Sequence, residues 1–170
     1  MAESGRKCTK VADSPNIASV EPPRGTFQAR VDEKGRLKLP AVFQQYLKEL
    51  GEEKVFVTSL DGRTGRLYPI SIWKQNEIAF ERAAEESEAA EDLALLANYF
   101  GEDSDVDPSG RVLVPTTLRR HLKIEGESVF LDCAKGRINL YGSSEFEARR
   151  LKALEGVDEK LKKLTRLGLK

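Results

Sequence analysis

Residues 31–40 read VDEKGRLKLP and residues 106–115 read VDPSGRVLVP, so the chain contains one motif twice, 75 residues apart. The two windows share an Asp, a Gly, an Arg and a Pro, and apolar residues stand one and three positions after each Arg. Asp and Gly are typical of tight turns, and apolar residues at every second position are typical of a strand with one buried face. Each copy therefore predicts a turn that leads into a short β-strand.

The residues around the motif extend the repeat. The first copy is preceded by a strand-like run at 26–31, and a helical apolar pattern follows the Pro of each copy. Pro is well placed in the first turn of a helix, and Gly51 and Gly126 predict where the two helices end. Strand-like runs follow at 55–60 and 128–133, each leading into a turn and a second short strand. The chain therefore reads as an internal duplication of strand, turn, strand, helix, strand, turn and strand.

The fold class that these patterns predict is α+β. A unit of roughly 50 residues buries too little surface to be stable alone, so we expect two units to share one pseudo-twofold core with interleaved hairpins. The tail reads as one charged amphipathic helix over 145–167. We divide the chain into a disordered N-terminal extension (1–24), a first unit (25–75), a helical connector without Pro or Gly (76–100), a second unit (101–148) and a C-terminal helical tail (149–170).

The composition is typical of a soluble globular protein, with 39% hydrophobic and 33% charged residues. No run approaches the roughly 18 apolar residues that a membrane helix needs, and residues 1–24 lack the apolar region of a secretory signal. Cys8 and Cys133 form no metal-binding spacing. We therefore expect a reduced, cytoplasmic protein without a membrane partner.

The formal net charge of zero hides an uneven distribution. Residues 71–107 contain 11 Asp or Glu and only 2 Lys or Arg, whereas residues 108–170 contain 14 Lys or Arg and 8 Asp or Glu. Residues 1–40 are also basic, with 8 Lys or Arg and 5 Asp or Glu. The local field decides whether a polyanion is attracted, so the overall neutrality does not exclude a nucleic-acid partner.

The motif allows a structural and a functional interpretation. Structurally, an Asp accepts hydrogen bonds from turn amides, a Gly supplies a positive φ, and an Arg four residues later pairs with the Asp, so the motif clamps a hairpin. This interpretation covers Asp32, Gly35, Asp107 and Gly110.

The basic residues of the motif favour a functional interpretation. A two-stranded β-ribbon fits the major groove of DNA, and the guanidinium of Arg makes forked contacts with phosphate or guanine. Two such ribbons related by an approximate twofold axis match the way in which duplex DNA is usually bound. The residues that we expect to contact DNA are Arg30, Lys34, Arg36 and Lys38 on the first hairpin and Arg111 on the second.

The sequence predicts no catalytic residues, no metal site, no cofactor and no small-molecule substrate. His121 is the only histidine and aligns with Tyr46 on what we expect to be the inner side of a helix, where it would pack rather than react. Neither cysteine stands at a helix start or in a basic context, and there is no Gly-rich phosphate loop. An enzyme is therefore disfavoured.

The paired motifs resemble those of the MraZ proteins, bacterial relatives of the AbrB/SpoVT swapped-hairpin transcription factors. Further matches are GTF at 25–27, RLYPISIW at 66–73 and LLANYFGEDSDVD at 95–107. The resemblance covers roughly residues 25–150. It implies two tandem AbrB-like swapped-hairpin units that form one β-barrel-like core with flanking helices.

The resemblance also implies a function. MraZ proteins are nucleoid-associated DNA-binding regulators encoded at the head of the division and cell-wall gene cluster. They bind short direct repeats in their own promoter, usually repress it, and assemble into homo-oligomeric rings. The family signature falls on Asp32 with Arg36 and on Asp107 with Arg111, and the lysine in the EKG turn favours the first unit as the stronger DNA-binding one. The stretch DCAKGRINLY at 132–141 departs from the family pattern. What the resemblance implies about subunit contacts therefore does not extend to this stretch, whereas the expectation of DNA binding is unaffected.

Two alternatives stay open. One is an antitoxin-like swapped-hairpin protein that mainly binds a protein partner, although such proteins usually have a single hairpin unit and a disordered inhibitory tail. The other is a scaffold that assembles without DNA and uses the acidic connector as a docking surface.

Overall fold

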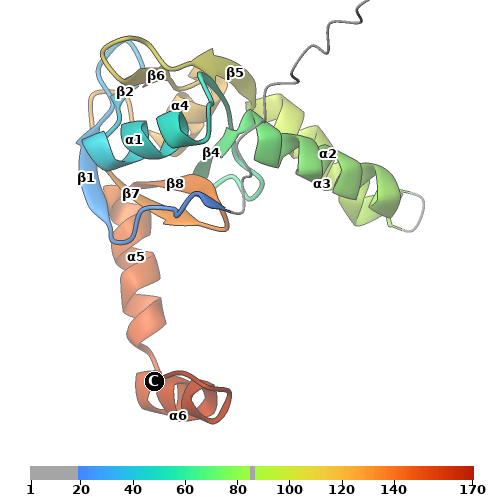
Figure 1. Ribbon diagram of the computed structural model, residues 1–170, viewed down its shortest axis with the longest axis vertical. Helices are drawn as coiled ribbons and strands as arrows, with labels where there is room; N and C mark the ends of the chain where they lie inside the picture. Colours follow the sequence, from blue (N-terminus) through green and yellow to red (C-terminus); the bar gives the residue numbers. More distant parts are fainter. Residues whose placement is uncertain (1–18, 85–86) are drawn as a thin grey trace, which may run out of the picture.

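The computed structural model describes residues 19–84 and 87–170, and this part of the chain contains eight strands and six helices (Figure 1). The fold is α+β, as the sequence predicts. The elements of the first repeat are β1 (Phe27–Arg30), β2 (Arg36–Lys38), α1 (Ala41–Glu49), β3 (Lys54–Thr58) and β4 (Gly65–Pro69). Those of the second are β5 (Glu102–Asp105), β6 (Arg111–Leu113), α4 (Thr116–Leu122), β7 (Ser128–Ala134) and β8 (Arg137–Gly142).

The remaining helices lie between and after the repeats. The connector forms α2 (Ile70–Ala84) and α3 (Glu88–Phe100), and the tail forms α5 (Ser143–Leu154) and α6 (Val157–Arg166). Gly156 lies between α5 and α6 with a φ of 61°, so the prediction of one helix over 145–167 is wrong. The predicted disorder of residues 1–24 falls largely on residues 1–18, which lie outside the described residues.

The helices of the two repeats begin alike and end differently. Pro40 and Pro115 stand directly before α1 and α4, one position earlier than we expect from the sequence. Gly51 follows the end of α1 with a φ of 73°. In α4, by contrast, Lys123 adopts the left-handed conformation that caps the helix, so the prediction that Gly126 ends this helix is wrong.

Six strands form one antiparallel sheet in the order β1-β7-β8-β4-β3-β5, and β2 and β6 form a separate two-stranded sheet. The large sheet is open because β1 and β5 are its edges. The predicted β-barrel-like core is therefore corrected: the strands do not close into a barrel, since β2 and β6 pair with each other rather than extend the large sheet.

Strands of one repeat pair with strands of the other throughout the molecule. The first strand of each repeat joins the third strand of the other, since β1 pairs with β7 and β5 pairs with β3. The last strands meet as β4 and β8. One hydrophobic core unites the repeats, and its buried members include Leu37, Leu39, Phe43, Leu47, Val55 and Leu67 from the first and Val112, Val114, Leu118, Val129, Leu131, Ile138 and Leu140 from the second.

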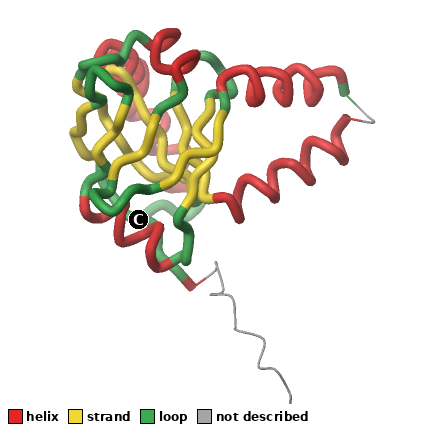
Figure 2. The backbone as a smooth tube through the Cα atoms, turned by 90° about the horizontal axis from the view of Figure 1, so that it is seen from above, coloured by secondary structure: helices red, strands yellow, loops and turns green. Residues whose placement is uncertain are grey.

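Two helical arms extend from the sheet in different directions (Figure 1). The first arm is the α2–α3 hairpin, which Figure 2 shows standing out beside the strands. A second cluster of buried side chains anchors it, namely Phe56, Tyr68, Trp73 and Ala97. The other arm is α5 followed by α6, and it is attached by Phe146, whose ring stacks on Phe130 at 4.3 Å. In the described part of the chain, no helix has the length and hydropathy to cross a membrane.

Candidate nucleic-acid interface

The first Asp-x-x-Gly-Arg loop is closed by a set of hydrogen bonds centred on Asp32. The Asp32 N–H donates to the Arg36 carbonyl at 2.9 Å, and the Gly35 N–H donates to the Asp32 carbonyl at 2.9 Å. The Asp32 Oδ1 accepts from the N–H groups of Lys34 and Arg36, and its Oδ2 accepts from the Arg36 Nε at 2.9 Å. The loop is thus fixed by its own carboxylate, which also holds the arginine side chain.

These contacts stabilise the charged form of the carboxyl group. The hydrogen bond from the Arg36 N–H is the main cause that lowers the pKa of Asp32, and the guanidinium of Arg36 and the Lys34 N–H act in the same direction. Desolvation opposes them, but the net shift is downward. Asp32 is therefore a carboxylate over the whole physiological pH range.

The second loop repeats the same backbone pattern. The Asp107 N–H donates to the Arg111 carbonyl, and the Gly110 N–H donates to the Asp107 carbonyl, both at 2.9 Å. The Asp107 Oδ1 accepts from the Arg111 N–H at 2.9 Å. The side chains differ: among the described residues, the structure gives the guanidinium of Arg111 no ion pair, whereas that of Arg36 is paired with Asp32.

The two loops are tied to each other by backbone and side-chain hydrogen bonds. The Leu39 N–H donates to the Gly110 carbonyl at 2.9 Å, and the Val114 N–H donates to the Gly35 carbonyl at 2.8 Å. The Nζ of Lys38 also donates to the carbonyl of Ser109. The loops therefore form one unit, although 75 residues separate them in the chain.

Strands β2 and β6 bring the basic side chains of both loops to one surface. Leu37 and Val112 stand opposite each other and are fully buried. Side chains alternate along a strand, so the neighbours of these two residues face outward. We call this surface the ribbon face, and its members are Arg36, Lys38, Arg111 and Leu113.

The ribbon face is basic and accessible. The side chain of Arg36 is 41% exposed, Lys38 is exposed, and Arg111 is half-buried. Lys38 stands directly opposite Arg111, and Arg36 stands opposite Leu113, which is 47% exposed. Three of the four outward positions thus carry a positive charge, as binding to an anionic backbone requires.

The structure brings together three of the five residues predicted to contact DNA, namely Arg36, Lys38 and Arg111. Lys34 is exposed on the turn next to them. Arg30 is exposed at the end of β1, and its partner is Ser128 of the large sheet, so it does not belong to the ribbon face.

The expected pairing of the basic ribbon is wrong. Between β1 and β2 there is only an isolated bridge of Val31 with Leu37. The two-stranded ribbon is formed instead by β2 and β6, one strand from each repeat. The molecule thus has one shared ribbon where the sequence predicts two separate ones.

Sequence reasoning missed two side chains that support the loops. Gln44 of α1 lies against Gly110, and Arg119 of α4 lies against Gly35, so that a Cβ on either glycine would meet these side chains at 2.6 Å or less. Both residues also donate to a backbone carbonyl, Gln44 Nε2 to Leu39 at 2.7 Å and Arg119 Nη1 to Val114 at 2.8 Å. Gln44 and Arg119 are themselves 75 residues apart, which is the signal that could have revealed them.

His121 lies elsewhere than predicted. Tyr46 is buried, and its hydroxyl donates to the Gly136 carbonyl at 2.9 Å. His121 is exposed, so its predicted position on the inner side of the helix is wrong. It packs against Phe100 with 4.8 Å between the ring centroids, and its Nε2 lies 2.9 Å from the Gly62 carbonyl.

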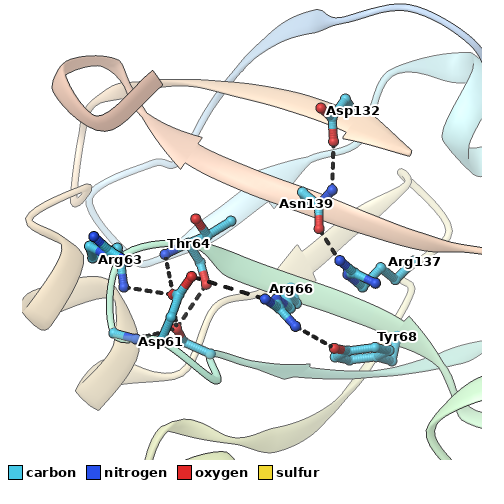
Figure 3. A network of polar contacts seen from close by, with 10 residues as sticks. Asp61, Arg63, Thr64, Arg66, Tyr68, Asp132, Arg137 and Asn139 are labelled. Atoms are coloured by element: carbon cyan, nitrogen blue, oxygen red, sulfur yellow. Dashed lines mark hydrogen bonds and ion pairs between the residues drawn. The ribbon is translucent and has the colours of Figure 1, made fainter. Parts of the chain in front are cut away.

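A second polar cluster involves the turn between β3 and β4 and the strands β4, β7 and β8 of the large sheet (Figure 3). Asp61 accepts from the N–H groups of Arg63 and Thr64, and its carboxylate lies 4.0 Å from Arg66. Burial raises the pKa of Asp61, but these hydrogen bonds and Arg66 outweigh it and leave the pKa below its usual value.

On the neighbouring strands, Asn139 donates to Asp132 at 2.7 Å and accepts from Arg137 at 3.1 Å (Figure 3). Close by, burial and the charge of Asp132 raise the pKa of Cys133 to about 11. The thiol is therefore protonated at neutral pH and is a poor nucleophile. No group of three or more His, Cys, Asp or Glu side chains in the described residues could hold a metal ion.

Comparison with known proteins identifies the family. No protein-family model matches the chain. A protein of Acidobacterium capsulatum named Transcriptional regulator MraZ is 37% identical over 106 residues, which cover 62% of this chain and 73% of that protein. Proteins of the same name are 35% identical in Koribacter versatilis, over 61% of this chain and 71% of that protein, and 31% identical in Marinomonas sp., over 75% and 84%. The resemblance of the paired motifs is thereby confirmed, and the chain belongs to the MraZ family.

Proposed function

We propose that the chain is a sequence-specific transcriptional regulator that binds double-stranded DNA with the ribbon face. The observation that carries the proposal is the pairing of β2 with β6, which places Arg36, Lys38 and Arg111 on one outward surface. A two-stranded β-ribbon is among the elements that enter the major groove. The names of the relatives support the regulatory role.

Each basic residue has a distinct task in this proposal. Within the guanidinium of Arg36, the Nε donates to Asp32, and the terminal amino groups serve to contact a phosphate or a guanine. Arg111 makes the equivalent contact from the other repeat. Lys34 and Arg30 flank the ribbon and contact phosphates. Because Lys34 has no lysine counterpart in the second repeat, the first repeat contributes more to DNA binding.

The proposal includes the biological setting. The protein acts in the cytoplasm at the nucleoid, binds direct repeats in its own promoter, and represses a cluster of division and cell-wall genes. Its repeats are fused swapped-hairpin units of the AbrB class, and identical chains assemble into a homo-oligomer, as a ring. A ring presents many ribbon faces at a fixed spacing, which suits a series of direct repeats.

A mobility-shift titration with the DNA upstream of the protein's own gene tests the proposal. The chain should bind this DNA more tightly than random duplex, and the affinity should fall as the salt concentration rises. Arg36→Ala should weaken binding by roughly tenfold or more and lower the salt slope by about one. The matched control is Arg24→Ala, which removes an exposed arginine that pairs with Glu21 outside the ribbon face.

Two outcomes would count against the proposal. Unchanged binding by a folded Arg36→Ala variant would remove Arg36 from the interface. If the wild-type chain showed no preference for the upstream DNA, the antitoxin-like alternative would take its place.

A further inference from the structure

The C-terminal arm carries an apolar face that nothing in the described chain covers. Every residue from 151 to 170 is exposed. On α6, Val157, Leu161 and Leu164 nevertheless recur with helical spacing, and their exposed fractions are 37%, 49% and 49%. We call this set the tail face. An isolated ten-residue helix such as α6 is marginal in water, so a packing partner is expected for it.

The other arm contains a groove of matching chemistry. A cavity of about 430 Å³ lies between α2 and α3. Its floor contains Trp73 and Phe80, whose ring centroids are 6.1 Å apart, and its rim contains the exposed Glu77 and Glu81. We call it the hairpin groove, and its lining is completed by Ala94, Ala97 and Asn98. An aromatic floor with an acidic rim suits a helix that has leucines on one side and lysines on the other.

The charges of the two arms are complementary. Residues 149–170 contain 8 Lys or Arg and 3 Asp or Glu, whereas residues 70–100 contain 7 Asp or Glu and 2 Lys or Arg. Such opposite fields attract two surfaces and orient them. Within one chain, however, the arms leave the sheet in different directions (Figure 1), so the tail face does not cover its own hairpin groove.

We propose that α6 of one chain docks through its tail face into the hairpin groove of a second copy of the chain. The inference rests on the proposed assembly of identical chains and names the surfaces that build it. The contact is heterologous because one surface meets a different one. A pair of chains therefore retains one free tail face and one free hairpin groove. Repetition of such a contact gives a closed ring when the rotation per subunit divides the full turn.

The first test measures the mass of the full-length chain and of point variants by light scattering after gel filtration. Leu161→Asp/Leu164→Asp should reduce the assembly to monomers, with a dissociation constant raised by about a hundredfold or more. Lys162→Gln/Lys163→Gln lowers the net charge by two, as the double aspartate variant does, but it leaves the apolar residues of the tail face unchanged. It should weaken the assembly only modestly, and lower salt should restore it.

The groove side is tested by variants that keep the fold. Glu77→Lys/Glu81→Lys reverses two exposed rim charges, and Ala94→Arg places a long side chain in the groove. Both should give monomers that keep the circular dichroism of the folded chain and still melt cooperatively. Trp73 is the only tryptophan of the chain, so its fluorescence should change with concentration in the wild type and stay constant in the tail variant.

Mixing the two kinds of variant decides between head-to-tail and symmetric contacts. A chain with an intact groove and a chain with an intact tail can form one contact, so the mixture should contain a two-chain complex and nothing larger. If the mixture stays monomeric, or if either variant assembles like the wild type, the inference is wrong while the proposed oligomer stands. If the wild-type chain is itself a monomer, both the inference and the proposed oligomer are wrong, and the two faces belong to another occupant. Binding to upstream DNA is measured separately and does not depend on this result.

Discussion

Asp32 illustrates how one carboxylate can serve the backbone and a side chain of the same loop. Its Oδ1 accepts two backbone N–H groups and its Oδ2 holds the Nε of Arg36. Asp107 fulfils the backbone part of this task for Arg111. The structural and the functional interpretations of the motif are thus compatible, since the residue that closes the loop also orients the arginine.

The lowered pKa of Asp32 gives a prediction for stability against pH. A carboxyl group with a lowered pKa stabilises the folded state above its unfolded value, near 3.8, and this contribution is lost as the pH falls through the still lower folded value. Asp32→Asn should therefore lower the melting temperature at pH 7. Thermal unfolding followed by circular dichroism should show the difference from wild type shrinking as the pH falls below 3.8. A difference that is constant from pH 7 to pH 2 would contradict the role of the charge.

Position 110 requires a glycine because of its backbone conformation and because the side chain of Gln44 lies against it. Its φ is 74°, and an added Cβ would meet the side chain of Gln44 at 2.1 Å. Gly110→Ala should cost about 1–2 kcal/mol for the left-handed conformation and more for displacing Gln44. Gly126→Ala is the control, because its φ of 71° carries the same strain and its Cβ would make only an ordinary contact at 3.6 Å. Urea unfolding should show a larger decrease in the free energy of unfolding for Gly110→Ala than for Gly126→Ala. Adding Gln44→Ala to Gly110→Ala should reduce this difference in free energy.

At the scale of elements, local signals explain what sequence reasoning predicted well. The strand-like runs at 55–60 and 128–133 correspond to β3 (Lys54–Thr58) and β7 (Ser128–Ala134). The connector, which the sequence predicts to be helical, forms α2 and α3. These features depend on residue spacing, turn residues and helix-breaking residues, all of which can be read within a short window.

The remaining features depend on contacts between distant segments. Alternation predicts which face of β2 is buried but not which strand lies beside it, so the pairing with β6 could not be foreseen. The break at Gly156 was missed because the apolar spacing continues across it. The hairpin groove depends on how α2 packs on α3, which the apolar pattern of either helix alone does not specify.

Leu113 is the apolar exception on the ribbon face. It is 47% exposed and aligns with Lys38 of the first repeat. If the ribbon face binds DNA, Leu113→Lys should strengthen binding and steepen the salt dependence by about one unit, because it adds one phosphate contact. The mobility-shift titration used for Arg36→Ala measures this. An unchanged salt slope in the folded variant would mean that this position lies outside the contact.

At the scale of the whole molecule, the repeats complete each other. All pairs between the repeats, namely β1 with β7, β2 with β6, β3 with β5 and β4 with β8, contribute to the same fold. Neither repeat has a complete sheet or a complete ribbon face. The core is likewise built from both sides.

This interdependence predicts the behaviour of a divided chain. Fragments 1–86 and 87–170 should each be largely unfolded, because each would expose apolar residues that the other covers. Mixed in equal amounts, they should recover the circular dichroism and cooperative melting of the intact chain at micromolar concentration. A fragment that melts cooperatively by itself would show that a single repeat is a sufficient folding unit.

The covalent fusion of the repeats has a consequence for how this surface can evolve. In a pair of identical chains, every mutation changes both halves of a symmetric grip at once. Here one codon changes one half only, and the halves already differ, with Lys38 matched by Leu113 and Tyr46 by His121. If the ribbon face binds DNA, selection can therefore change the nucleotide contacts of one half while the other half keeps its own.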